Sequence, residues 1–306
     1  MSSDEKMRDS TAIGFAYGIA AYTLWGFLPL YWKQLSEIPP MEILAHRILW
    51  SFLFVAAIVY FEGTIHKCKE VFYDRTSIMR IVYATVLISV NWGLYIWAIN
   101  TNHVVEASMG YYMNPLVVVL LGVLVLKEKL SGYQIISLIL AAAGVLIITI
   151  QYGQFPWISL NLAVSFGLYG LMKKMIPVGS TVGLAIETAI LMPMTLGYIL
   201  FRQIAGIGAL GSVTRITTLL LIGSGVATAL PLLWFARAAR RIPLSSMGFL
   251  QYISPSISLV LGVFVFKEQF TTTHFISFGF IWAGLLIYSV SQIKSVRYKS
   301  VQSVQR

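Results

Sequence analysis

The segment YMNPLVVVLLGVLVLKEK at residues 112–129 recurs 140 positions later as YISPSISLVLGVFVFKEQ at residues 252–269. Over residues 111–150, 14 of the 40 positions are identical to those 140 positions further on. The identities include a proline, two glycines and a Lys-Glu pair. Self-similarity at a fixed offset indicates that the chain contains one structural unit twice.

The similarity between the two copies extends beyond this segment. Three weaker matches pair residues 25–33 with 166–174 at an offset of 141, residues 44–47 with 184–187 at 140, and residues 108–110 with 246–248 at 138. Chance coincidence of apolar residues explains any single match, but the common order and the near-constant offset favour duplication. The sequence therefore predicts two repeats, residues 1–150 and residues 151–306, the second with a C-terminal tail.

The composition indicates a membrane protein. The chain is 58% hydrophobic and only 11% charged, whereas soluble domains carry about 25% charged residues. Runs near 20 residues with few charges predict ten spans. They cover residues 12–32, 41–61, 78–99, 105–126, 132–150, 156–174, 180–201, 216–236, 243–266 and 273–293. Because the backbone must be hydrogen-bonded internally in lipid, we expect an all-α membrane protein of ten transmembrane helices.

Five spans per repeat is an odd number, so the second repeat crosses the bilayer in the opposite direction to the first. The sequence thus predicts two inverted five-helix repeats, a construction used by secondary transporters. The connections between spans are short, which leaves no room for an inserted soluble domain.

The net charge of +10 would suggest a nucleic-acid partner in a soluble protein. Here its distribution indicates topology instead. With the N-terminus inside, 17 Lys and Arg residues fall in cytoplasmic segments and 4 in outer segments. This bias predicts that both termini are cytoplasmic and that nucleic acid is not a partner.

Two ionisable residues, Arg47 and Glu187, fall inside expected spans at equivalent positions of the two repeats. An ionised group at the bilayer midplane costs about 2.5–3.5 kcal/mol on insertion scales, and such groups are usually functional or paired. One interpretation is structural: each charge is held by local polar partners or by the other. The alternative is a pair of poles in a central cavity, with Arg47 holding a substrate carboxylate and Glu187 meeting an amino group or carrying a proton.

Other candidate binding residues surround these two. His46 is either a packed, hydrogen-bonded histidine or a proton or substrate group, and Trp25 is a candidate for stacking on a solute. Glu106, at the start of the fourth span, is expected to be a solvated carboxylate near a helix N-terminus.

Two glycine–proline pairs occupy corresponding places in the fourth and ninth spans. Gly110 and Pro115 in the first repeat match Gly248 and Pro255 in the second. Proline removes a backbone donor and kinks a helix, and paired interruptions of this kind indicate a midplane site or hinge. The alternative is a simple kink that neighbouring helices satisfy. The polar groups near these positions are Tyr111, Tyr112, Asn114, Gln251, Tyr252 and Ser254.

The sequence gives little basis for an enzyme. Residues 206–211 match a dinucleotide-binding fingerprint by spacing, but neither the expected strand nor the expected acidic residue accompanies it. No phosphate-binding loop is present, the four histidines have no metal-ligand spacing, and no nucleophile–base pair stands out. We therefore expect no catalytic residue, no metal and no cofactor.

Several segments resemble the drug/metabolite transporter superfamily, EamA type, and more narrowly its RarD subfamily. They are WGFLPLYWK (25–33), EILAHR (42–47), NWGLYIWAIN (91–100), EASMGYYMNP (106–115) and AARRIPLS (238–245). The resemblance implies a multi-pass permease of the bacterial plasma (inner) membrane that exports small metabolites by alternating access.

The expected function is thus secondary active transport of an amino-acid-like or amphipathic solute, with a proton or other ion gradient as a possible energy source. The alternative is a translocator of lipids or lipid-linked substrates with the same fold. That alternative requires a groove open to the bilayer near Gly110 and Gly248.

Overall fold

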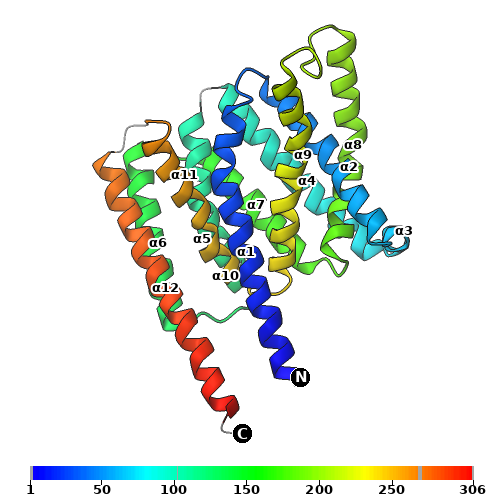
Figure 1. Ribbon diagram of the computed structural model, residues 1–306. Helices are drawn as coiled ribbons and strands as arrows, with labels where there is room; N and C mark the ends of the chain where they lie inside the picture. Colours follow the sequence, from blue (N-terminus) through cyan, green and yellow to red (C-terminus); the bar gives the residue numbers. More distant parts are fainter. Residues whose placement is uncertain (1–2, 102, 268–270, 305–306) are drawn as a thin grey trace.

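The computed structural model describes residues 3–101, 103–267 and 271–304, and within these ranges all regular structure is helical. The helices are α1 (Ser3–Lys33), α2 (Pro40–Phe61), α3 (Ile65–Tyr73), α4 (Arg75–Asn100), α5 (Val104–Leu124), α6 (Gly132–Tyr152), α7 (Trp157–Met175), α8 (Ser180–Ile204), α9 (Arg215–Ala239), α10 (Leu244–Gln251), α11 (Ile253–Phe264) and α12 (Thr272–Val304). The start of α1 and the end of α12 lie at the same end of the bundle (Figure 1). The prediction of an all-α membrane protein is confirmed.

Nine segments of the described ranges are long and apolar enough to cross a membrane. The tenth expected span, 156–174, is the 19-residue helix α7, whose last turn carries two lysines. One short helix, α3, was not expected; it lies between the second and third spans. The ten-helix expectation therefore holds approximately.

The ninth span is broken, whereas the fourth is continuous. The span Leu244–Phe264 is divided at Tyr252 into α10 and α11, with Pro255 in the first turn of α11. Its counterpart α5 runs unbroken through Pro115. Proline at the start of a helix costs little, because the N–H that it lacks would have no partner there.

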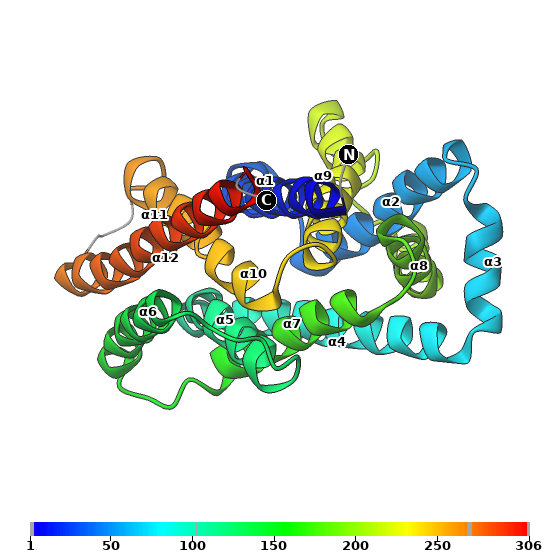
Figure 2. The same ribbon diagram turned by 90° about the horizontal axis from the view of Figure 1, so that it is seen from below.

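Viewed along the bundle, the helices form two layers (Figure 2). One layer contains α4, α5, α6 and α7, and the other contains α1, α9, α10, α11 and α12. Each layer therefore includes one long helix from the other half of the sequence. The layers meet where α6 contacts α12 and where α5 contacts α10, while α2 packs against both α8 and α9.

The largest buried cluster joins residues of α1 to α5 and of α7 to α10. Trp25 lies in its aromatic part, with its ring centroid 5.6 Å from that of Tyr22, 5.7 Å from Phe235 and 6.0 Å from Phe166. Aromatic pairs at such distances stabilise a core beyond their buried area. Trp25 therefore packs between the two layers, against rings from α1, α7 and α9.

Candidate functional site

Arg47 lies on α2 among residues from three other helices or their ends. Its Nε donates a hydrogen bond of 2.9 Å to Thr228 Oγ1 on α9. Its guanidinium carbon lies 4.6 Å from the ring centroid of Trp32 on α1 and 5.6 Å from that of Trp92 on α4. These contacts are cation–π interactions, which strengthen when they are desolvated. Arg47, Thr228, Trp32 and Trp92 are called the Arg47 site below.

Glu187 on α8 is paired with a residue that the sequence had not indicated. Lys173 Nζ on α7 lies 2.7 Å from Glu187 Oε1, and the exposed fractions of the two side chains are 4% for Glu187 and 3% for Lys173. The Tyr169 hydroxyl donates to Glu187 Oε2 at 3.3 Å. A buried carboxylate with these partners forms a neutral unit with the lysine, so its charge does not act alone.

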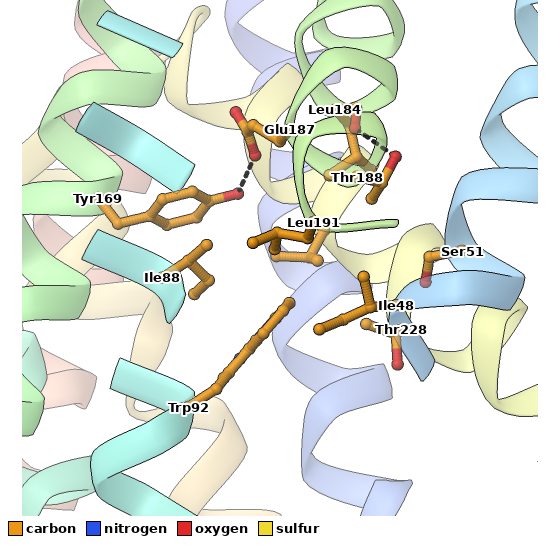
Figure 3. Close-up of a pocket in the computed structure, with 11 residues that line it drawn as sticks. Ile48, Ser51, Ile88, Trp92, Tyr169, Leu184, Glu187, Thr188, Leu191 and Thr228 are labelled. Carbon is orange, nitrogen blue, oxygen red and sulfur yellow. Dashed lines mark hydrogen bonds between the residues drawn. The ribbon is translucent and has the colours of Figure 1, made fainter. Parts of the chain in front are cut away.

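A small cavity lies between these two charged groups. Its lining residues are Ile48, Ser51, Ile88, Trp92, Tyr169, Leu184, Glu187, Thr188, Leu191, Thr228 and Leu232 (Figure 3). Thr228 and Trp92 belong to the Arg47 site, whereas Glu187 and Tyr169 approach from the opposite side. Glu187 thus lines this central cavity directly, whereas Arg47 does not line it and is represented there by its contacts Thr228 and Trp92.

The volume of the central cavity is about 10 Å³. A space of about 10–15 Å³ is needed to hold one water molecule. Any solute larger than water therefore requires the helices around the cavity, α2, α4, α7, α8 and α9, to move apart. The central cavity is therefore too small for such a solute in this conformation.

His46 is fully buried on α2 and does not line the central cavity. Its Nδ1 accepts a hydrogen bond of 3.2 Å from Trp50 Nε1. Its Nε2 is buried and has no hydrogen-bond partner among the described residues. Because Nδ1 is the acceptor, the proton of a neutral His46 is on Nε2.

The two glycines predicted as hinges lie at tight helix contacts. A Cβ on Gly248 would come within 2.7 Å of the carbonyl oxygen of Pro115, and one on Gly110 would lie 3.1 Å from Leu162 Cβ. Both glycines are buried. They therefore allow α10 to approach α5 and α5 to approach α7, and neither faces an open groove.

The other predicted polar residues lie outside the lining of the central cavity. They are Tyr111, Tyr112, Asn114, Gln251, Tyr252 and Ser254. Tyr111 packs edge-on to Tyr95 of α4, with 5.9 Å between the ring centroids. Tyr112 packs edge-on to Phe278 of α12, and Asn114, Gln251 and Tyr252 are buried. The structure thus gives none of these six residues a place in the lining of the central cavity.

Two further glutamates are buried and have structural partners. Glu42 accepts from Arg202 at 2.9 Å and from the backbone N–H of Ala209 at 2.6 Å. Glu106, expected to be solvated, is 4% exposed and accepts a hydrogen bond of 2.8 Å from the Tyr152 hydroxyl. The expectation was wrong because the start of α7 folds over the start of α5, so that Ile158 N–H also donates to Glu106.

Comparison with known proteins identifies the fold family. Residues 12–150 match the EamA-like transporter family. The chain is 46% identical over 290 residues to the "Uncharacterized transporter YojE" of Bacillus subtilis, covering 93% of this chain and 96% of that one. It is 37% identical over 290 residues to "Protein RarD" of Escherichia coli, covering 95% and 98%.

A third relative, "Protein RarD" of Streptomyces exfoliatus, is 40% identical over 292 residues, which are 95% of this chain and 93% of that one. A solved crystal structure shares the fold with a TM-score of 0.68 at 20% identity, covering 92% of this chain and 98% of that chain. These relatives are named as transporters or as RarD, and the chain is accordingly a membrane transporter rather than an enzyme. The chain belongs to the RarD group of EamA-type transporters, within the drug/metabolite transporter superfamily.

Proposed function

We propose that the chain is a secondary active transporter that exports small amphipathic or amino-acid-like metabolites across the bacterial plasma membrane. The observation that carries this proposal is the central cavity inside the apolar bundle, which is lined by Glu187 and by Thr228 and Trp92, two residues that contact Arg47. Ionised groups inside a membrane usually mark a solute or ion pathway. A closed passage with a polar group at each end fits the occluded state of an alternating-access cycle.

We further propose that residues 1–150 and 151–306 are inverted copies of one unit. Backbone geometry supports this proposal. Among the described residues other than glycine, only Lys127 and Lys267 have positive φ, at 56° and 59°, and they are 140 positions apart. Such angles are uncommon outside glycine, so their occurrence at two equivalent lysines, each just after a corresponding span, supports duplication of one unit.

Helix contacts at glycines also recur in equivalent pairs. Gly144 of α6 lies against the Ser277 carbonyl of α12, and Gly284 of α12 lies against the Ser137 carbonyl of α6. Gly26 of α1 lies against Ile257 of α11 in the same way that Gly167 of α7 lies against Val117 of α5. If each residue is replaced by its equivalent in the other repeat, one contact of a pair turns into the other contact of that pair. This reciprocity supports a pseudo-two-fold axis between the two layers.

The two charged groups follow the same relation. Trp32 aligns with Lys173 at an offset of 141, and Arg47 aligns with Glu187 at 140. In the first repeat Arg47 lies over the Trp32 ring, and in the second Glu187 pairs with Lys173. The same two positions are thus in contact in both repeats, as a cation–π pair in the first and as an ion pair in the second.

Inverted copies allow the cycle that we propose. If the copies exchange conformations, the passage that is open on one face closes and the opposite face opens. A proton or other ion gradient across the membrane would supply the energy. Both termini would lie in the cytoplasm, as the distribution of Lys and Arg suggests.

Translocation of a lipid or lipid-linked substrate is the second candidate. A groove of about 280 Å³ lies between α1, α11 and α12, lined by Phe27, Ser256, Ile257, Val260, Leu261 and Trp282. It is almost wholly apolar and would accept an acyl chain. However, none of its lining residues belongs to the central cavity, and Gly110 and Gly248 are closely packed. Solute transport is therefore the preferred function.

The proposed function predicts solute release from vesicles. Proteoliposomes containing the purified chain would be loaded with a bacterial metabolite extract, and the external solution would be followed by mass spectrometry with and without a pH gradient. We expect at least one water-soluble metabolite to leave faster than from protein-free liposomes. Release of none, with and without the gradient, would remove solute transport and leave the lipid alternative.

The inverted repeat predicts that Lys129, before α6, and Thr272, at the start of α12, lie on opposite sides of the membrane. Cys68 is the only cysteine, so a Cys68→Ala background permits single-cysteine labelling. Lys129→Cys is expected to react only after the membrane is permeabilised, and Thr272→Cys in intact cells. Both positions are exposed. Labelling of both positions from the same side would contradict the inverted topology.

A further inference from the structure

We propose that the Arg47 site binds the anionic group of an organic acid, so that the transported solute carries a net negative charge. This inference rests on the proposed function and narrows its substrate class. It replaces the expectation that Arg47 and Glu187 together hold a zwitterion. Among the described residues, Glu187 has a partner of opposite charge and Arg47 does not.

The carboxylates nearest to Arg47 along α2 and across the cavity are already neutralised. Glu187 is bound to Lys173 at 2.7 Å. Glu42, five residues before Arg47, uses one oxygen for Arg202 and the other for the Ala209 N–H. Among the described residues, no carboxylate forms an ion pair with Arg47. The Arg47 site therefore carries one positive charge in an apolar bundle.

The guanidinium group also has hydrogen-bond donors to spare. It carries five N–H donors, and Nε alone is hydrogen-bonded within the described part of the chain, to Thr228. The remaining donors lie on the terminal nitrogens, Nη1 and Nη2, which form a planar fork. That geometry matches a carboxylate or phosphate with two parallel hydrogen bonds.

The surroundings favour an acid with an apolar body. Trp32 and Trp92 lie against the guanidinium. Arg47 is partly exposed, and the two tryptophan rings can contact rings or alkyl chains of a solute.

A zwitterion fits this arrangement less well than the corresponding acid. Its ammonium group would need a free carboxylate near the central cavity, and the one available is Glu187. Glu187 could serve only by separating from Lys173, which would leave a lysine buried and unpaired. Removing one partner of a buried ion pair is strongly unfavourable. The pairing at Glu187 thus selects against a positive charge on the solute.

The test is calorimetric titration of the purified full-length protein in detergent, in a buffer without chloride, because chloride would compete for Arg47. Two matched series would be used. One contains indole-3-propionate, its amide, tryptophan and tryptamine, and the other contains hexanoate, hexanamide, norleucine and hexylamine. We expect at least one acid to bind at least tenfold more tightly than its amide, amino acid and amine.

Variants assign the preference to Arg47. Arg47→Gln is expected to abolish the advantage of the acid, and Arg47→Lys to retain a reduced advantage, because the charge remains without the fork. Arg215→Gln, at the exposed start of α9, removes the same charge elsewhere and should retain the full advantage. If Arg47→Gln does not fold, the relative affinities of the acid and its analogues in the wild type and in Arg47→Lys test the proposal.

Equal binding of acid and amide in both series, or an unchanged preference in Arg47→Gln, would overturn the proposal. Its failure is distinguishable from failure of the transport function. Release of only neutral or cationic metabolites from proteoliposomes would support the transport function and contradict the anion-binding proposal. Tight acid binding without release of any metabolite would support the anion-binding proposal and contradict the transport function.

Discussion

Replacement of Lys173 by methionine is expected to destabilise the protein by about 3–5 kcal/mol, the range measured when one partner of a buried ion pair is removed. The carboxylate of Glu187 would remain buried, with the Tyr169 hydroxyl as its remaining hydrogen-bond partner. Reversible unfolding in mixed micelles would measure the loss, and a lower thermal midpoint should accompany it.

Two further variants identify the cause. In Lys173→Met combined with Glu187→Leu, most of the lost stability should return, because an apolar pair of similar volume is often as stable as the ion pair. Lys129→Met, in an exposed loop, should change the free energy of unfolding by less than about 0.5 kcal/mol. A Lys173→Met protein as stable as wild type would show that Glu187 does not depend on Lys173.

The overall fold could be predicted from the sequence because its signals are local. Long apolar runs give the spans, and the recurrence of residues 112–129 shows that one unit occurs twice. The difference between α5 and the broken pair α10–α11 could not be predicted, since both spans contain a proline at the same place. Packing against other helices, rather than the proline alone, decides whether the span breaks.

The site was predicted in part. Arg47 and Glu187 stand out because charges inside apolar runs are rare. Lys173 does not, because a lysine at the end of a span usually extends toward the membrane surface, and its partner is 14 residues away on another helix. Only the alignment of the two repeats could have indicated Lys173. In that alignment Lys173 is equivalent to Trp32, and Glu187 is equivalent to Arg47.

The predicted binding residues of α5 and α10 illustrate a second limit. Helical spacing places Tyr111 and Tyr112 about 100° apart, but it does not say which of them faces the centre. The structure packs Tyr111 against Tyr95 of α4 and Tyr112 against Phe278 of α12. The choice depends on how α5 is rotated against α7 and α10, which no local pattern encodes.

Gly225→Ala is expected to disrupt the contact that supports the Arg47 site. A Cβ on Gly225 of α9 would lie 2.3 Å from the backbone carbonyl carbon of Trp50 and 2.6 Å from the backbone nitrogen of Ser51, both on α2. Because these atoms belong to the backbone, α2 and α9 must separate. Overpacking of this kind costs about 1–3 kcal/mol and occasionally more.

Separation of the two helices has a functional consequence that a surface change would not have. Gly225 lies three residues before Thr228, the residue that holds Arg47 Nε, and its carbonyl accepts a hydrogen bond of 2.9 Å from Ser51 Oγ. Moving α9 away would lengthen both bonds at once. Acid binding in the calorimetric titration should therefore weaken at least tenfold, together with the loss of stability.

The matched control for Gly225→Ala is Gly197→Ala on α8, where nothing lies within 4 Å of the added Cβ. Alanine is the better helix former by about 1 kcal/mol, so this variant should be as stable as wild type or more stable, with unchanged binding. If both variants behave alike, close approach of α2 and α9 is not required, and Thr228 does not position Arg47. If only Gly225→Ala loses binding, the spacing between these two helices sets the geometry of the anion site.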